Sequence, residues 1–354
     1  MIDGRVCRVV LAILVAGCGG GQAASALATP SIAPVIVAPV PAAPPSPTAR
    51  PTPRPTLKLP DAIDLFTTTA LRIRATPNPD FIVLAGGYAF ASGVGTGIGR
   101  FDGMTGGLVG SIEIPGRSCE ALDAGFGAAW TATCDAPGLV RIDPATGTAT
   151  GIDIGGRIPE PEASIGAGEG GVWLIVGGTP RRLVKVDPAA NAVAGSWEIP
   201  GTPSAVRAGL GAVWISDPSA NVIHRVDPAS GAIVATIKVG RQPQFIAVGE
   251  GALWTMDQAY GTVSRVDPAT NTVTATIELG ETVQGGDIAV GGGYVWLRGS
   301  RTLLFQIDPA TNEIVARYGP NSGSGSVAAD DAAVWITAHD VTTVWRLEHS
   351  GVVE

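Results

Sequence analysis

The sequence predicts an all-β protein: a seven-bladed β-propeller of four-stranded antiparallel blades, with the ring closed by an N-terminal strand in the last blade. Two sequence anchors each recur seven times, the first at spacings of 39 to 43 residues, and four short strand patterns fit into each interval. Units of about 40 residues with four strands are typical propeller blades. The 49 glycines and 28 prolines, against 15% charged residues, suit short strands joined by tight turns.

The N-terminal residues precede this fold. Arg5 and Arg8 stand before a short apolar run, VVLAILVAG. The run is too short for a membrane anchor, which needs about 20 residues, and it is typical of a signal peptide. The run leads into VAGC, which ends at Cys18 and resembles the bacterial lipobox. That resemblance implies a signal peptide over 1–17 and a diacylglyceryl thioether on Cys18. An ordinary signal peptide with an incidental cysteine is the alternative.

Residues 18–60 show no periodic pattern, and eleven of the 28 prolines lie between Pro30 and Pro60. Because proline lacks an N–H donor and has a fixed φ, this stretch cannot pair into a sheet or continue a helix. We expect a disordered tether, rich in Pro and Ala, that reaches up to about 3.1 Å per residue. The alternative is that this segment has no spacing role, and that interpretation predicts the same disorder.

The repeats occupy the predicted propeller domain, residues 61–354. The first anchor is a small-residue turn followed by an apolar pair and an aromatic residue. Its aromatic residues are Phe90, Trp130, Trp173, Trp214, Trp254, Trp296 and Trp335. The second anchor is a phrase of the type RVDPATN. It begins at Arg100, Arg141, Lys185, Arg225, Arg265 and Gln306, with a decayed copy at Arg346.

Each unit divides into four strands, a to d, counted from the channel outwards. In the fifth unit these are FIAVGEG, ALWTMDQ, TVSRVD and TVTATIEL. The Asp-Pro-Ala-Thr-Asn phrase joins c to d and is turn chemistry. Asp accepts backbone hydrogen bonds, Pro presets φ, and Asn or Gly tolerates the left-handed conformation. The repeated tryptophans are expected to fill the space between blades.

Ring closure is also visible in the sequence. The chain ends at Glu354, where a seventh strand d has barely begun. Upstream of the first strand a, TTTALRIRA at 67–75 matches a strand d. We therefore expect the N-terminal segment to supply the outer strand of blade 7, which removes a free sheet edge.

These motifs resemble a known group. The phrase V-x-R-V-D-P-A-T-N-x-V-x-A-T-I-x-x-G, preceded by I-A-V-G-x-G-A-x-W, resembles the YVTN-type repeat propellers, of which YncE-like proteins are members. It is also similar to the streptogramin B lyase group, which shares this blade pattern. The resemblance covers 67–354 and concerns structural motifs, so it implies the fold and says little about function.

Two of the four cysteines remain once Cys7 leaves with the signal peptide and Cys18 is lipidated. Cys119 begins strand a of the second unit, and Cys134 ends its strand b, so the two face each other across an antiparallel pair. Residues in such a pair lie about 4.5–5.5 Å apart at Cα, within disulfide range. A disulfide suits an exported protein, and two reduced buried thiols are the alternative.

Chemistry in a propeller sits mostly at the channel mouth formed by the d–a and b–c loops. Variable loops on a rigid scaffold are where function resides. The predicted binding residues in these loops are Arg117, Glu120, Arg157, Asp217, Arg241, Asp257, Arg298 and His339. A mixed polar rim without a specific ligand is the plainer interpretation.

Catalysis has little support in the sequence. The lyase resemblance implies a cluster of His and Glu that holds a divalent metal. Of the three histidines, only His339 falls at the mouth, so that cluster does not carry over. Asp217 and Asp257 occupy equivalent slots in adjacent blades but supply too few oxygens for a hard cation, and turn capping is the favoured role for both. We predict no metal and no cofactor.

Two classes of function remain. The first is a non-catalytic, lipid-anchored module that binds a protein, a peptide or an envelope ligand at the mouth. The second is an extracytoplasmic lyase or hydrolase that uses His339 with rim carboxylates. The net charge of −8 argues against a nucleic-acid partner. We expect a monomer on the membrane's outer leaflet or, since Gly19 is not the Asp of an inner-membrane retention signal, in the outer membrane of a two-membrane cell.

Overall fold

The computed structural model describes residues 57–74, 79–93, 97–159, 162, 164–320 and 323–349. The signal peptide, Cys18 and most of the predicted tether lie outside these residues. Two 3₁₀ turns are the helical elements described, η1 (Leu65–Thr67) and η2 (His339–Val341). Within the described part of the chain, no helix is both long and apolar enough to cross a membrane.

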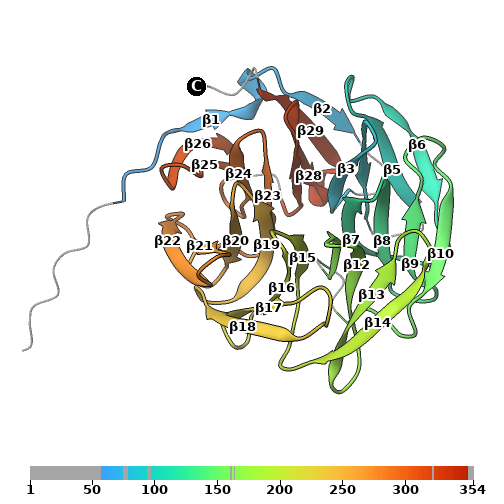
Figure 1. Ribbon diagram of the computed structural model, residues 1–354. Coiled ribbons are helices and arrows are strands. Elements are labelled where there is room, and N and C mark those ends of the chain that lie inside the picture. Colours follow the sequence, from blue (N-terminus) through green and yellow to red (C-terminus); the bar gives the residue numbers. More distant parts are fainter. Residues whose placement is uncertain are drawn as a thin grey trace, which may run out of the picture. The chain divides into compact units, whose positions relative to one another are not determined.

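Seven four-stranded antiparallel sheets stand around a central channel, which confirms the predicted propeller (Figure 1). Blade 1 comprises β3 (Ile82–Ala85), β4 (Tyr88–Ala91), β5 (Gly97–Asp102) and β6 (Leu108–Glu113). Blade 2 comprises β7 (Ser118–Gly125), β8 (Ala128–Thr133), β9 (Gly138–Ile142) and β10 (Ala149–Asp153). Blade 3 comprises β11 (Ile165–Gly168), β12 (Gly171–Val176), β13 (Arg181–Asp187) and β14 (Ala192–Ile199).

Blades 4 to 7 repeat the same order, with the first strand of each innermost. They comprise β15 (Val206–Gly209), β16 (Ala212–Asp217), β17 (Val222–Val226), β18 (Ile233–Lys238); β19 (Pro243–Gly249), β20 (Ala252–Asp257), β21 (Thr262–Asp267), β22 (Thr272–Glu278); β23 (Asp287–Gly291), β24 (Tyr294–Arg298), β25 (Leu304–Asp308), β26 (Glu313–Gly319); and β27 (Val327–Ala329), β28 (Ala333–Ala338), β29 (Thr343–Glu348).

The N-terminal segment closes the ring as predicted. Strand β2 (Leu71–Arg74) pairs antiparallel with β29 and becomes the outer strand of blade 7. An additional strand that the sequence did not predict, β1 (Ala62–Asp64), pairs in parallel with β26 at the edge of blade 6 (Figure 1). The carbonyl of Pro60, just before β1, accepts a hydrogen bond from Arg317 Nε (2.8 Å). This bond holds the start of the described chain against β26.

The repeated tryptophans pack between blades, as the sequence predicts. All six are 0–1% exposed. In five blades the indole Nε1 also donates to the carbonyl of a glycine five residues earlier. These glycines are Gly125, Gly168, Gly209, Gly249 and Gly291. Burial of the ring and satisfaction of its single donor together explain why tryptophan recurs at this position.

The c–d turns also follow the predicted chemistry. In blade 5, Asp267 Oδ1 accepts from the N–H of Ala269 at 2.8 Å. Asn271 closes the same turn at φ 57°, in the left-handed region that asparagine tolerates. The Asp-Pro-Ala-Thr-Asn phrase is therefore architecture.

The cation that opens this phrase links neighbouring blades. Arg265 lies 5.1 Å above the ring of Trp254 in its own blade. Its Nη1 donates to the carbonyl of Pro309 (2.6 Å) and to Asn312 Oδ1 (3.0 Å) in the next blade. We call the set of cation–aromatic pairs the girdle. It comprises Arg100–Tyr88, Arg141–Trp130, Lys185–Trp173, Arg225–Trp214, Arg265–Trp254 and Arg346–Trp335.

Candidate functional site

Four titratable side chains from neighbouring blades meet where the inner strands begin, at one mouth of the channel. Asp80 precedes β3, Glu120 lies in β7, Glu162 precedes β11, and His339 begins η2. One carboxylate oxygen from each of the three acids lies within 4.8 Å of the other two. The Nδ1 atom of His339 lies 3.4 Å from Asp80 Oδ1. We call these four residues the mouth cluster.

A bulge in β7 positions Glu120. The register of β7 against β8 shifts between Ser118 and Leu122, and Glu120 adopts φ 70°. Its N–H donates to Ser118 Oγ at 3.1 Å, and its carbonyl accepts from Ser92 of blade 1. A bulge of this kind re-aims a side chain, and a non-glycine residue keeps a positive φ only where its surroundings enforce it.

The predicted disulfide is present and fixes this bulge covalently. Cys119 and Cys134 are bonded, with their Cα atoms 4.9 Å apart. Beside it, the N–H of Arg117 donates to Asp135 Oδ1 at 2.7 Å. The covalent link therefore holds the backbone on the N-terminal side of Glu120 to the end of β8.

Electrostatics within the mouth cluster favour a proton or another cation. Burial, with the neighbouring charges of Asp80, Glu120 and Asp287, raises the pKa of Glu162 to about 7. Burial also raises the pKa of Glu120 and of Asp80, and the nearby His339 opposes both shifts. Three carboxylates this close repel one another when all are ionised, so a bound cation relieves the repulsion.

Carboxylates flank His339 on both sides. Its Nδ1 faces Asp80, and its Nε2 lies 2.7 Å from Asp340 Oδ1. The second oxygen of Asp340 accepts from the N–H of Ser324 at 3.1 Å, which holds that carboxylate in place. A general base must offer a free nitrogen to the substrate. In this geometry both ring nitrogens are engaged, so His339 acts as a positioned partner of carboxylates.

The structure brings two of the eight predicted binding residues together, Glu120 and His339. Arg117, Arg157 and Arg241 are exposed and do not belong to the mouth cluster. The other three residues, Asp217, Asp257 and Arg298, end strands β16, β20 and β24, and their side chains are buried, with 0–1% exposed. A residue in the right loop of the sequence is therefore not necessarily at the surface of the mouth.

Asp217 caps its loop, which is the role the sequence favours for both aspartates, whereas Asp257 binds hydroxyls of strands β20 and β21. Asp217 Oδ1 accepts from the N–H of Ala220 (3.1 Å) and from Ser219 Oγ (2.7 Å). Asp257 accepts from Ser264 Oγ at 2.6 Å and from two threonine hydroxyls. Burial raises the pKa of Asp257 to about 6, against these hydrogen bonds.

Arg298 is a structural brace. Its guanidinium donates to the backbone carbonyls of Gly299 (2.5 Å), Gly323 (2.6 Å) and Thr337 (3.3 Å). The last two lie in the loop before β27 and in β28, so the side chain ties blade 6 to blade 7. Burial lowers the pKa of Arg298 to about 10, which leaves it charged at neutral pH.

Asp80 and Glu162 were not among the predicted binding residues. Asp80 and Glu120 share one signal, because both stand ten residues before the aromatic anchor of their unit, Phe90 and Trp130. Glu162 stands eleven before Trp173. Alignment of the units on their anchors would have placed these three carboxylates at the same level of adjacent blades.

Comparison with known protein families finds none that matches the chain, and no curated protein matches it. The YVTN resemblance therefore rests on the sequence motifs, with the seven-bladed fold established independently by the structure.

Proposed function

We propose that this protein is a lipid-anchored, extracytoplasmic YVTN-type propeller that binds a protein, a peptide or an envelope ligand at the channel mouth without catalysis. The mouth cluster carries the proposal, since three carboxylates with raised pKa values converge on one point. The ligand group that fits them is a cation, such as a lysine side chain or another amine. The lipobox-like VAGC, the tether and the disulfide support export and anchoring.

The binding test uses the mouth cluster itself. We expect a short lysine-rich peptide to bind the full chain, and the double variant Asp80→Asn with Glu162→Gln to bind at least about tenfold more weakly. Fluorescence anisotropy of the labelled peptide measures the affinity. Glu113→Gln, an exposed carboxylate on an outer strand, is the matched control and should leave binding unchanged. Equal affinity of the wild type and the double variant would refute the proposal.

The anchor has a separate test. If Cys18 is lipidated, the protein should partition into the detergent phase, and Cys18→Ser should move it to the aqueous phase. A wild-type protein found entirely in the aqueous phase would rule out the anchor and leave the mouth site untouched.

The mouth cluster also favours a second function, a metal-dependent lyase or hydrolase. Asp80, Glu120 and Glu162 supply converging oxygens, and His339 supplies a nitrogen beside them. This set fits a hard divalent cation whose remaining positions are filled by water, and the cation would polarise a substrate oxygen. The engagement of both His339 nitrogens places this function second.

Titration calorimetry with Mg²⁺ and Ca²⁺ separates the two functions. For the binding module we expect no site tighter than about millimolar, the weak end of the range for protein cation sites. A micromolar site that disappears in Glu162→Gln would promote the enzyme to first place.

A further inference from the structure

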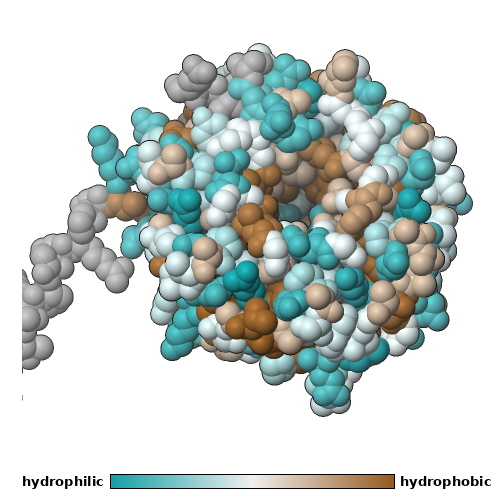
Figure 2. All heavy atoms as spheres, in the orientation of Figure 1, coloured by the Kyte–Doolittle hydropathy of each residue, from teal (hydrophilic) through white to brown (hydrophobic). Residues whose placement is uncertain are grey.

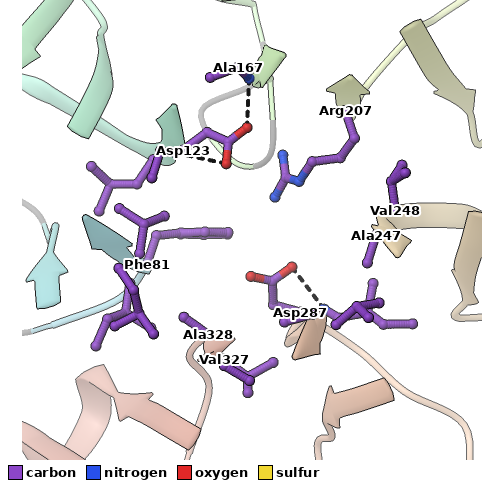
Figure 3. Close-up of a pocket in the computed structure, with 18 of the residues that line it drawn as sticks. Phe81, Asp123, Ala167, Arg207, Ala247, Val248, Asp287, Val327 and Ala328 are labelled. Carbon is purple, nitrogen blue, oxygen red and sulfur yellow. Dashed lines mark hydrogen bonds between the residues drawn. The ribbon is translucent and has the colours of Figure 1, made fainter. Parts of the chain in front are cut away.

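The central channel holds a cavity of about 330 Å³ next to the mouth cluster. It lies at the small end of ligand pockets, which span about 300–1,000 Å³. Phe81, which directly follows Asp80, contributes to its wall together with Ala247, Val248 and Val327 (Figure 3). Figure 2 shows the propeller hollowed at its centre, with hydrophobic and hydrophilic residues around the opening. A small solute therefore has a way in from solvent.

Three charged side chains from separate blades point into this cavity: Asp123 from β7, Arg207 from β15 and Asp287 from β23 (Figure 3). Three backbone N–H groups and one serine hydroxyl hold the two carboxylates. Asp123 accepts from Ala124 (2.9 Å) and from Ala167 of blade 3 (2.7 Å). Asp287 accepts from Ile288 (2.8 Å) and from Ser326 Oγ (2.6 Å). Each carboxylate is thus fixed and keeps lone pairs for a ligand.

The guanidinium of Arg207 is only partly used. Its Nη1 donates to the carbonyls of Ile165 (2.8 Å) and Val206 (3.0 Å). Among the residues that the structure describes, Arg207 forms no ion pair with Asp123 or Asp287. Burial raises the pKa of Asp123 and raises that of Asp287 to about 6, and Arg207 opposes both shifts. The guanidinium of Arg207 and the two carboxylates therefore attract one another across the cavity without forming an ion pair. A ligand that carries both a positive and a negative group can fill the space between them.

These residues break the pattern of the inner strands. The position seven residues before the aromatic anchor holds Ala247, Ala289 and Ala328 in three blades, Gly166 in another and Val83 in the first. In the second and fourth blades it holds Asp123 and Arg207. Both charged side chains hydrogen-bond the inner strand of blade 3, and they also present charge to the cavity, which the alanines, the glycine and the valine at this position do not.

We propose that the channel cavity binds a small zwitterion of the α-amino acid class, with its carboxylate on Arg207 and its ammonium group between Asp123 and Asp287. A guanidinium fork matches a carboxylate, and two fixed carboxylates match an ammonium group. The apolar wall formed by Phe81, Val248 and Val327 accommodates the ligand's side chain. This site is separate from the mouth cluster and does not depend on the function proposed above.

Titration calorimetry tests the full chain against each of the protein amino acids. We expect at least one to bind with a dissociation constant below about 1 mM. Its methyl ester lacks the carboxylate and its N-acetyl derivative lacks the ammonium group, and each should bind at least about tenfold more weakly. Absence of binding by the whole set, or equal binding of both blocked derivatives, would overturn the proposal.

Variants then locate the site. Arg207→Met should abolish binding of that amino acid and leave binding of the lysine-rich peptide unchanged, whereas Arg74→Met, at an exposed arginine on the outer strand β2, should change neither. Circular dichroism confirms that each variant is folded. If Arg207→Met does not fold, Arg207→Lys serves instead, because it keeps the charge and loses the fork, and we expect at least about tenfold weaker binding. Unchanged affinity in a folded Arg207 variant would exclude this site.

Discussion

The girdle and the channel are built on the same seven blades but follow opposite rules. At the girdle, six blades pair a cation on strand c with an aromatic ring on strand b. Along the channel, equivalent positions hold alanine or glycine in some blades and Asp123 or Arg207 in others. The girdle residues are therefore repeated from blade to blade, whereas the channel residues differ between blades.

The difference follows from what each side chain contacts. A girdle cation reaches the turn of the next blade, so it recurs at almost every blade boundary. Asp123 and Arg207 line the cavity and hydrogen-bond the inner strand of blade 3, a contact that does not recur at every blade boundary. Blade 6 shows the limit of the rule, since Gln306 replaces the cation and the ring of His349 lies 5.9 Å from that of Trp296.

The largest effect should come from removing a strand of the repeated framework. Deletion of residues 1–76 removes β2 and opens blade 7, which should cost more than about 4 kcal/mol, the range of exceptional losses. Deletion of 1–60 keeps β1 and β2. Of the described residues it removes 57–60, with the Pro60 carbonyl and the Leu57 and Leu59 side chains beside Gly280, so it should stay cooperative. Thermal melts followed by circular dichroism compare the two, and identical melting would contradict the assignment of β2.

The next largest effect should come from the aromatic member of a girdle pair. Trp254→Ala leaves a cavity in a core shared by blades 4, 5 and 6 and should lower the free energy of unfolding by about 3–5 kcal/mol. Tyr260→Ala is the matched control, because that ring is 64% exposed, and it should cost no more than about 0.5 kcal/mol. Urea titration measures both, and similar losses would show that the girdle is not special.

The cation of the same pair should matter less. Arg265→Met keeps much of the aliphatic stem but loses the contact with the Trp254 ring and the hydrogen bonds to blade 6. We expect a loss of about 1–2 kcal/mol, since such contacts contribute about 0.5–2 kcal/mol. Arg301→Met, at an exposed arginine, should be neutral in the same titration. If Arg265→Met were as stable as the wild type, the aromatic rings alone would account for the girdle's contribution to the free energy of unfolding.

The smallest effect should have the opposite sign, because it lies on the variable side of the comparison. The pKa of Glu162 is about 7, above its ordinary 4.5, so the folded state binds the proton more tightly than the unfolded state. Glu162 therefore contributes stability at low pH that is lost as the pH rises from 4.5 through 7. Glu162→Gln should be more stable than the wild type at pH 8, by about 1 kcal/mol after solvent screening, and equal to it at pH 4.

Melting temperatures of the wild type and Glu162→Gln between pH 4 and pH 8 measure this difference, with Glu113→Gln as a control that should show no trend. A constant offset across that range would mean that Glu162 does not titrate in the mouth cluster.

Local periodicity determined much of this protein. Turn phrases and aromatic anchors recur because each blade must satisfy the same backbone hydrogen bonds and bury the same faces, so they specified the propeller, its closing strand β2 and the Cys119–Cys134 pair. The parallel strand β1 escaped prediction because three residues carry no period, and only the edge of β26 gives them a partner.

Tertiary structure alone decided the site. Asp80 and His339 lie 259 residues apart in the chain and meet only because the ring closes. Loop position in the sequence could not separate Glu120, which the β7 bulge turns into the mouth, from Asp217, which caps its own loop, and Asp257, which binds hydroxyls of β20 and β21. The direction of a polar side chain depends on which donors surround it in space, and a linear pattern does not contain that information.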